Sequence, residues 1–252
     1  MIHRIDVHHH LLTPRLVEEL SSVGIDHAGG SALPSWKPQD SLAMMDRHGI
    51  DVALLSMPVP LQFGDQVHTR DVARSLNEFG AECVARWPQR FGLFATLPLP
   101  DVGAALDEIA YAFDTFGADG IGLLSNHAGV YLGDPRLEPV VAELDRRGAV
   151  AFGHPTVFTG GEIPTAPNAG SPIPTIEPSL LEFIFDTTRT VASLVISATL
   201  KRYPRVRFIL SHAGGTIPYV HDRILDARRS SRSSGARKLV RSRPPRLRPS
   251  SA

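Results

Sequence analysis

The sequence predicts an α/β fold, a (β/α)8 TIM-type barrel. Short β-rich apolar runs alternate with longer stretches of helical periodicity, which is the pattern of parallel strands joined by crossover helices. Polar motifs follow the carboxyl ends of several of these runs, where barrels carry their functional side chains. A doubly wound sheet would fit part of the pattern, but the regular repetition favours the barrel.

Six strands are expected, with helices between them. The strands are Ile2–Val7, Asp51–Met57, Phe91–Leu97, Asp119–Leu124, Ala149–Gly153 and Val206–Ser211. In the clearest helix, Asp134 is the cap, Pro135 fits the first turn and Gly148 marks the end. Residues 155–178 contain six prolines and three glycines, and a connection of that length commonly covers a site.

Composition is consistent with one globular domain, assigned to residues 1–227. The chain has 252 residues, of which 42% are hydrophobic and 21% charged, enough for one sizeable core. Cys83 is the single cysteine, so no internal disulfide can form and a reducing, cytoplasmic setting is expected. No stretch has the pattern of a signal peptide or the length of a membrane span, so we expect a soluble protein.

The charge is unevenly distributed along the chain. Residues 228–252 hold nine basic residues and no acidic one, whereas residues 1–227 hold 17 basic and 26 acidic residues. The tail is rich in Arg, Ser and Pro, a composition that cannot bury enough surface to fold by itself. Disorder is therefore expected over residues 228–252.

Histidines at the ends of three predicted strands are the main candidates for function. His8 and His10 follow the first strand, and the alternation of side chains directs them to one side while His9 points to the other. His154 and His212 end the fifth and sixth strands. Neutral imidazoles ligate a divalent cation without cancelling its positive charge, so the cation can still act as a Lewis acid on a substrate oxygen or acidify a bound water. These side chains therefore suit a metal site at the barrel mouth.

Four further residues are weaker candidates for binding a substrate. Asn126 follows the fourth strand and could reach the barrel mouth, although a solvated loop explains it equally well. Arg189 could bind a carboxylate, although a surface arginine is the safer interpretation. Asp186 has the sequence context of a helix cap. Trp36 and Phe158, in predicted loops, could stack on an aromatic ring or simply pack those loops.

Three motifs resemble those of the aminocarboxymuconate-semialdehyde decarboxylase-like amidohydrolases. They are Ile5–Pro14, Phe152–Pro155 and Tyr203–Gly215, in the family's order. The segments around Leu132–Pro135 and Phe185–Arg189 most resemble the 6-methylsalicylate decarboxylase branch. The resemblance extends over about residues 2–226 and implies a barrel of the amidohydrolase type.

The resemblance also implies roles for the histidines. His8, His10 and His154 would ligate zinc, with manganese as the alternative, and His212 would handle the proton during decarboxylation of a small aromatic hydroxy acid such as 6-methylsalicylate. The arginine that aminocarboxymuconate enzymes carry before their second strand has no counterpart in Ser41–Asp46, which argues against that substrate. A homodimer is also implied by the resemblance, and neither nucleic acid nor membrane is expected as a partner.

The chain departs from the family pattern after Gly215. Family members continue into two more strands, the last of which supplies an aspartate to the metal, whereas this chain runs into Arg228–Arg232. We therefore expect a barrel truncated after the sixth strand, from a truncated or frame-shifted coding sequence. Loss of the carboxylate would leave metal binding feasible but put catalysis in doubt.

Two other functions fit parts of the sequence. A metal-activated water on the same barrel would serve hydrolysis of a lactone or amide, and release of CO₂ separates this alternative from decarboxylation. The basic tail could instead bind nucleic acid or another acidic surface, but it lacks aromatic residues for stacking and the rest of the chain is acidic.

Overall fold

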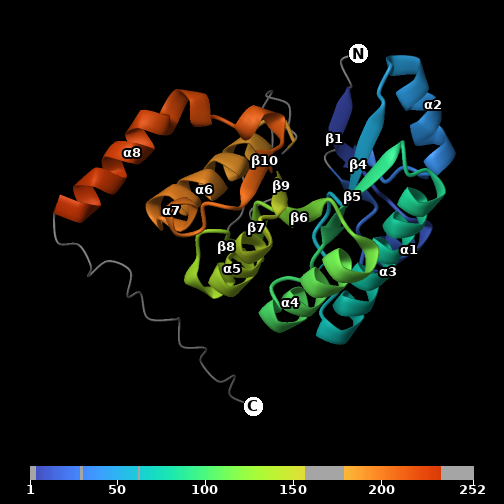
Figure 1. The fold of residues 1–252 in the computed structure, drawn as a ribbon, viewed down its shortest axis with the longest axis horizontal. Helices are drawn as coiled ribbons and strands as arrows, with labels where there is room; N and C mark the ends of the chain where they lie inside the picture. Colours follow the sequence, from blue (N-terminus) through green and yellow to red (C-terminus); the bar gives the residue numbers. More distant parts are fainter. Residues whose placement is uncertain (1–3, 29–30, 62, 157–178, 234–252) are drawn as a thin grey trace, which may run out of the picture.

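A curled parallel sheet is the framework of the molecule (Figure 1). The computed structural model describes residues 4–28, 31–61, 63–156 and 179–233. Its main sheet has six strands in the order β1-β4-β5-β6-β9-β10, all paired in parallel. These strands are β1 (Ile5–His10), β4 (Val52–Ser56), β5 (Phe91–Thr96), β6 (Gly120–Leu124), β9 (Val150–His154) and β10 (Arg207–Leu210). The sheet therefore has the topology of the predicted barrel.

Two short antiparallel pairs lie in the connections after the strands. They are β2 (His27–Ala28) with β3 (Ser31–Ala32), and β7 (Asn126–His127) with β8 (Val130–Tyr131).

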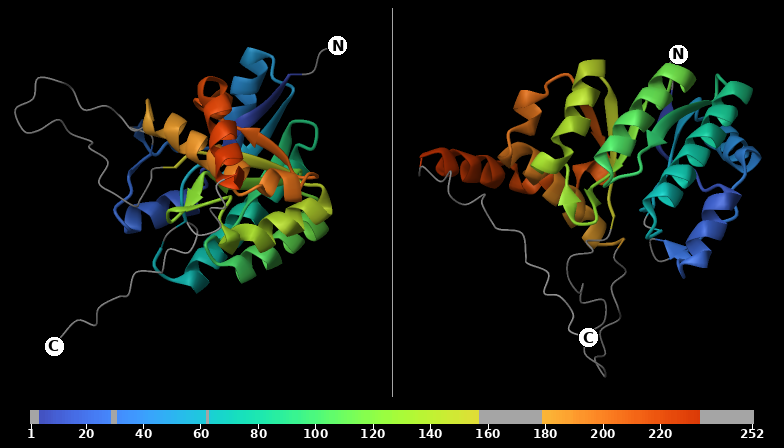
Figure 2. Two further views of the ribbon diagram at one scale, coloured as in Figure 1. Left: turned by 90° about the vertical axis from the view of Figure 1, so that its left-hand side faces the viewer. Right: turned by 90° about the horizontal axis from the view of Figure 1, so that it is seen from below.

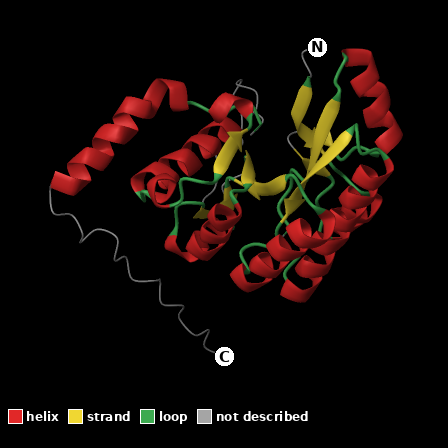
Figure 3. Ribbon diagram, viewed as in Figure 1, coloured by secondary structure: helices red, strands yellow, loops and turns green. Residues whose placement is uncertain are grey.

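The strands curl around the inside of the molecule, and the helices lie outside them (Figure 3). The α-helices are α1 (Pro14–Ser22), α2 (Pro38–His48), α3 (Gln66–Arg86), α4 (Val102–Tyr111), α5 (Glu138–Arg147), α6 (Glu182–Ile196), α7 (Thr199–Arg202) and α8 (Ile217–Ser233). Short turns of other helix types are η1 (Ala112–Phe116), η2 (Pro135–Leu137) and η3 (His212–Gly214). Helix α8 extends away from the sheet at one end of the molecule (Figure 2).

Apolar side chains fill both faces of the central strands. On the inner face, the rings of Phe94 and Phe152 stack with their centroids 5.5 Å apart, and Leu54 packs against them. On the outer face, residues such as Leu55 and Ile121 pack against the helices in the main core. Burial on both sides explains why these strands are near-continuous apolar runs in the sequence.

The predicted element boundaries hold closely, with one informative shift. The first strand lies three residues later than predicted, so the three histidines are part of β1 rather than of the loop after it. The helix signals near α5 are confirmed: Asp134 accepts a hydrogen bond from the Arg136 amide (2.9 Å), and Gly148 ends the helix with a φ of 62°. Cys83 is buried in α3, as its helical context indicates.

The segment predicted as a disordered tail begins inside a helix. Helix α8 continues through residues 228–233, where arginine is a good helix former and serine is tolerated. Residues 234–252, and most of the proline-rich connection predicted to cover a site, lie outside the described part of the chain. None of the described helices is long and apolar enough to cross a membrane.

Candidate metal centre

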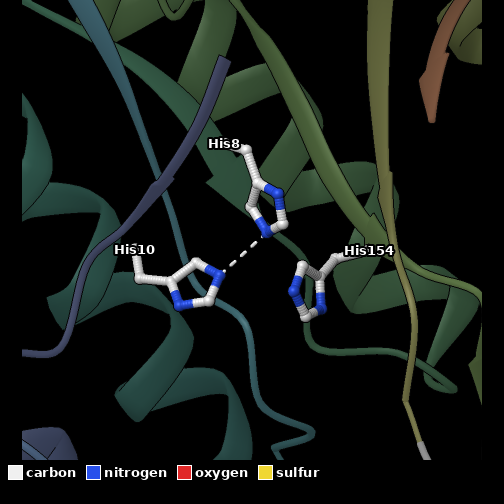
Figure 4. A group of neighbouring side chains, drawn as sticks. All are labelled: His8, His10 and His154. Carbon is white, nitrogen blue, oxygen red and sulfur yellow. Dashed lines mark hydrogen bonds between the residues drawn. The ribbon is translucent and has the colours of Figure 1, made fainter. Parts of the chain in front are cut away.

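Three imidazoles from two strands meet at the carboxyl edge of the sheet (Figure 4). His8 and His10 project from β1 to the same side, with their Nε2 atoms 3.0 Å apart, and His154 faces them from β9. One ligand-type nitrogen from each ring lies within 4.8 Å of the others. The alternation along β1 and the shared edge of parallel strands bring these rings together, as the sequence predicts.

The imidazoles of the cluster are held in their neutral form. Burial, followed by the proximity of the other histidines, lowers the pKa of His10 to about 4 and that of His154 to about 2. The pKa of His8 is lowered by the same two effects. Neutral rings keep a lone pair on nitrogen, which is the form that ligates a cation.

The orientation of β1 at this point depends on Asp6. One carboxylate oxygen of Asp6 accepts a hydrogen bond from the His8 amide (2.9 Å), and the other lies 3.0 Å from His9 Nδ1. His9 is buried on the opposite side of the strand, where its Nε2 lies 2.8 Å from the Ser41 hydroxyl. Asp6 therefore acts as a structural partner of β1, because it holds the His8 amide and the His9 ring beside the cluster.

His212 lies beside the cluster, directly after β10. Its ring centroid is 5.1 Å from that of His8 and 5.8 Å from that of His154. His212 and Ala213 both have positive φ, 50° and 55°, a conformation that costs about 1–2 kcal/mol for each residue other than glycine. Strain of this kind is commonly found where a backbone turn presents a functional side chain.

The cluster forms one wall of a cavity of about 380 Å³. Apolar side chains from four separate segments, among them Leu12, Trp36, Val59 and Phe183, make up most of the remaining wall. No lysine, arginine, aspartate or glutamate lines the cavity among the described residues. Its size and apolar lining suit a small organic molecule that carries one aromatic ring.

Two of the weaker candidates do not contact this cavity. Asn126 is buried, donates to Asp186 through Nδ2 (2.8 Å) and accepts from the Gly129 amide (2.9 Å). Arg189 lies on α6 with its Nη1 3.9 Å from Asp186, and its side chain is half exposed. Both side chains therefore interact with Asp186, and neither is among the residues that line the cavity.

The interpretation of Asp186 as a helix cap is wrong. Helix α6 begins at Glu182, so Asp186 lies within it, and its side chain is 1% exposed. The polar sequence that suggests a helix start is instead a buried polar face, because Thr187 and Thr190 are also buried. No local signal in the sequence marks this network, because the partners Ser125 and Tyr131 are distant from Asp186 in the chain.

Of the two aromatic residues predicted to contact a substrate, the structure describes only Trp36. Trp36 lines the cavity and packs edge-on against Phe79, with 6.1 Å between the ring centroids. Phe158 lies outside the described residues. Phe183 of α6, which was not among the predicted site residues, also lines the cavity, and its ring centroid is 6.2 Å from that of His154.

A parallel barrel-type sheet with imidazoles gathered at its carboxyl edge defines the class of the protein, that of (β/α)-barrel proteins with a histidine site. The chain matches the family model described as amidohydrolase (Amidohydro_2) over residues 5–237. The protein therefore belongs to the Amidohydro_2 family, as the three sequence motifs indicated.

Relatives of the chain include fungal decarboxylases. Decarboxylase macB of Penicillium terrestre is 37% identical over 229 residues, which cover 88% of this chain and 67% of that protein. The 6-methylsalicylic acid decarboxylase of Penicillium expansum is 35% identical over 222 residues, with coverages of 86% and 66%. The match thus spans about two thirds of the length of these relatives.

Solved structures share the same architecture. An amidohydrolase II structure superimposes with a TM-score of 0.81 at 31% identity, covering 90% of this chain and 72% of that one. The 5-carboxyvanillate decarboxylase of Novosphingobium aromaticivorans, complexed with manganese and 4-hydroxy-3-methoxy-5-nitrobenzoic acid, has a TM-score of 0.79 at 20% identity, with coverages of 94% and 72%. At that identity the likeness concerns the fold alone.

Stability should fall at acidic pH because of a buried histidine that lies outside the cluster. His127 is 7% exposed, its Nε2 has no hydrogen-bond partner among the described residues, and burial lowers its pKa to about 4. Between about pH 6.5 and pH 4 the unfolded chain binds a proton that the folded chain does not. The free energy of unfolding therefore falls as pH falls, by up to about 1.4 kcal/mol per pH unit from this residue.

Urea unfolding of the metal-free protein at pH 7 and pH 4.5 measures this contribution. We expect His127→Gln to reduce the loss of stability between the two pH values by about 2–3 kcal/mol relative to the wild type. The exposed residue His48 provides the control, since His48→Gln should behave like the wild type. An equal loss in wild type and His127→Gln would show that His127 does not titrate in this window.

Proposed function

We propose that the protein is a metal-dependent carboxy-lyase that removes the carboxyl group of a small aromatic hydroxy acid, 6-methylsalicylate being the first compound to test. The observation that carries the proposal is the convergence of three neutral imidazoles and a fourth histidine on one apolar cavity. The fungal relatives support this choice of reaction, because they are decarboxylases and one of them acts on 6-methylsalicylic acid.

The residues present fit a divalent cation. Three ligand nitrogens lie within 4.8 Å of one another, so small shifts of the rings would bring all three to the bond length of about 2.0–2.1 Å that zinc makes with nitrogen. Nδ1 of His154 donates to the carbonyl oxygen of Pro155 (2.7 Å), which leaves Nε2 as the ligand atom. When bound, the ion supplies the positive charge that receives the carboxylate and its neighbouring oxygen. Zinc is our first choice of ion and manganese the alternative.

The cavity itself selects an aromatic acid through its shape and polarity. Leu12, Val59 and Phe183 exclude water from the ring, and Trp36 offers an aromatic face. Since no basic side chain of Lys or Arg type lines the described cavity, the substrate's negative charge must be received at the histidine end. The carboxyl group is thereby oriented toward the cluster and the ring toward the apolar wall.

His212 is placed to move the proton that the reaction requires. Decarboxylation breaks the bond between the ring carbon and the carboxyl carbon, CO₂ leaves, and a proton takes its place on the ring. Burial lowers the pKa of His212 and so favours the neutral imidazole, which has one ring nitrogen to accept a proton and one N–H to donate it. The fungal relatives favour this chemistry over hydrolysis of a lactone or amide.

Replacing a cluster histidine should strongly weaken metal binding. We expect His8→Gln to weaken the binding of zinc or manganese by at least about 100-fold, the upper range observed for outer-shell partners alone. Calorimetric titration of the metal-free protein measures the affinity, with His48→Gln as the matched control on the surface. Unchanged affinity in His8→Gln would exclude the cluster as the metal site.

Replacing His212 should separate binding from chemistry. We expect His212→Gln to retain its metal and to lower CO₂ release from 6-methylsalicylate by about 10²–10⁴-fold, the range typical of a lost acid–base group. Headspace analysis of CO₂ and chromatography of the phenol product report the reaction. A wild-type protein that binds metal and releases no CO₂ from any hydroxybenzoate would contradict the proposed reaction but not the metal site.

A further inference from the structure

A buried carboxylate on α6 organises the strand ends next to the cluster. Asp186 accepts hydrogen bonds from the Ser125 hydroxyl, from Asn126 Nδ2 (2.8 Å) and from the Tyr131 hydroxyl (2.6 Å). Arg189 Nη1 lies 3.9 Å from the same carboxylate. A carboxylate that is 1% exposed needs such partners, and it can only accept hydrogen bonds when ionised. Its partners must therefore donate.

This requirement fixes the role of Ser125. Because the Ser125 hydroxyl hydrogen points to Asp186, the Ser125 oxygen is left as an acceptor, and it receives the amide hydrogen of Thr156 (3.0 Å). The Ser125 amide in turn donates to the carbonyl oxygen of His154 (2.7 Å). Ser125 thus holds the backbone on both sides of Pro155, immediately after the cluster histidine.

The hydrogen bonds continue through one peptide unit to the His154 ring. The Thr156 amide and the Pro155 carbonyl belong to the same planar peptide group. Its hydrogen is bound by Ser125, and its oxygen accepts from His154 Nδ1 (2.7 Å). Bonds in such a chain polarise one another, so a stronger bond at the amide hydrogen makes the carbonyl oxygen a better acceptor.

We infer that Asp186 and Ser125 are positioning residues that fix the tautomer and ring orientation of His154 through the peptide between Pro155 and Thr156. With Nδ1 protonated and held, Nε2 carries the lone pair toward His8 and His10. Outer partners that orient a ligating histidine in this way tune its metal affinity. The inference rests on the proposed function, because it assigns these residues a role at the same metal site.

A pair of single-hydroxyl deletions tests the inference. Ser125→Ala removes the link between Asp186 and the peptide, whereas Tyr131→Phe removes a hydroxyl from the other oxygen of the same carboxylate and leaves the link intact. We expect Ser125→Ala to weaken zinc binding by about 10–100-fold and Tyr131→Phe to change it far less. Asp186→Asn should resemble Ser125→Ala. Urea unfolding of each variant shows whether the losses of stability are comparable.

Nitrogen NMR of the metal-free protein provides a readout that does not depend on activity. We expect the His154 ring to be protonated at Nδ1 in the wild type and in Tyr131→Phe, and to be a mixture of tautomers in Ser125→Ala. If Ser125→Ala fails to fold, Ser125→Cys keeps a side chain of similar size with a weaker acceptor, and the same mixture is expected.

The outcomes separate this inference from the proposed function. A wild type that binds no zinc and no manganese would overturn both. A wild type that binds metal, together with a Ser125→Ala or Ser125→Cys variant that matches Tyr131→Phe in affinity and tautomer, would overturn the positioning role alone.

Discussion

The curvature of the parallel sheet is the constraint on which the site depends. His8 belongs to β1 and His212 follows β10, strands at opposite edges of the described sheet, yet their ring centroids are 5.1 Å apart. In a flat sheet these edge strands would be five inter-strand spacings apart, each of about 4.8 Å. The stacked rings of Phe94 and Phe152 fill the inner face of the curve, and Phe152 also contacts His8. Packing and site geometry are therefore consequences of the same curvature.

Burial then determines the chemistry of the histidines. At the edge of the sheet, the low polarity of the cavity keeps the cluster uncharged, so that its rings are ligands rather than cations. Two carboxylates near the site are held by hydrogen-bond donors: the partly buried Asp6 of β1 and the buried Asp186 of α6. Asp6 accepts a hydrogen bond from the His8 amide, and Asp186 is connected through Ser125 to the Thr156 amide, two residues after His154. Both carboxylates therefore hold backbone that carries or adjoins the cluster histidines.

The sequence was sufficient to predict the parts of the fold and site that depend on local periodicity. The six strands follow from their apolar runs, and the caps at Asp134 and Gly148 follow from the residue preferences of helix ends. The convergence of His8, His10 and His154 follows from alternation along a strand and from the shared edge of a parallel sheet. Contacts between distant segments could not be predicted in this way. Asp186 was misinterpreted because its partners Ser125 and Tyr131 are more than 50 residues away in the chain. The burial of His127 and the place of Phe183 in the cavity wall likewise depend on tertiary packing.

The most direct test of the account is to locate the metal by anomalous X-ray diffraction from crystals soaked in zinc. The account predicts one strong anomalous peak about 2.0–2.1 Å from a ring nitrogen of each of His8, His10 and His154, at the end of the cavity lined by Phe183. A zinc peak bound elsewhere, or an empty cluster at saturating zinc, would contradict the central claim that these three imidazoles form a metal site.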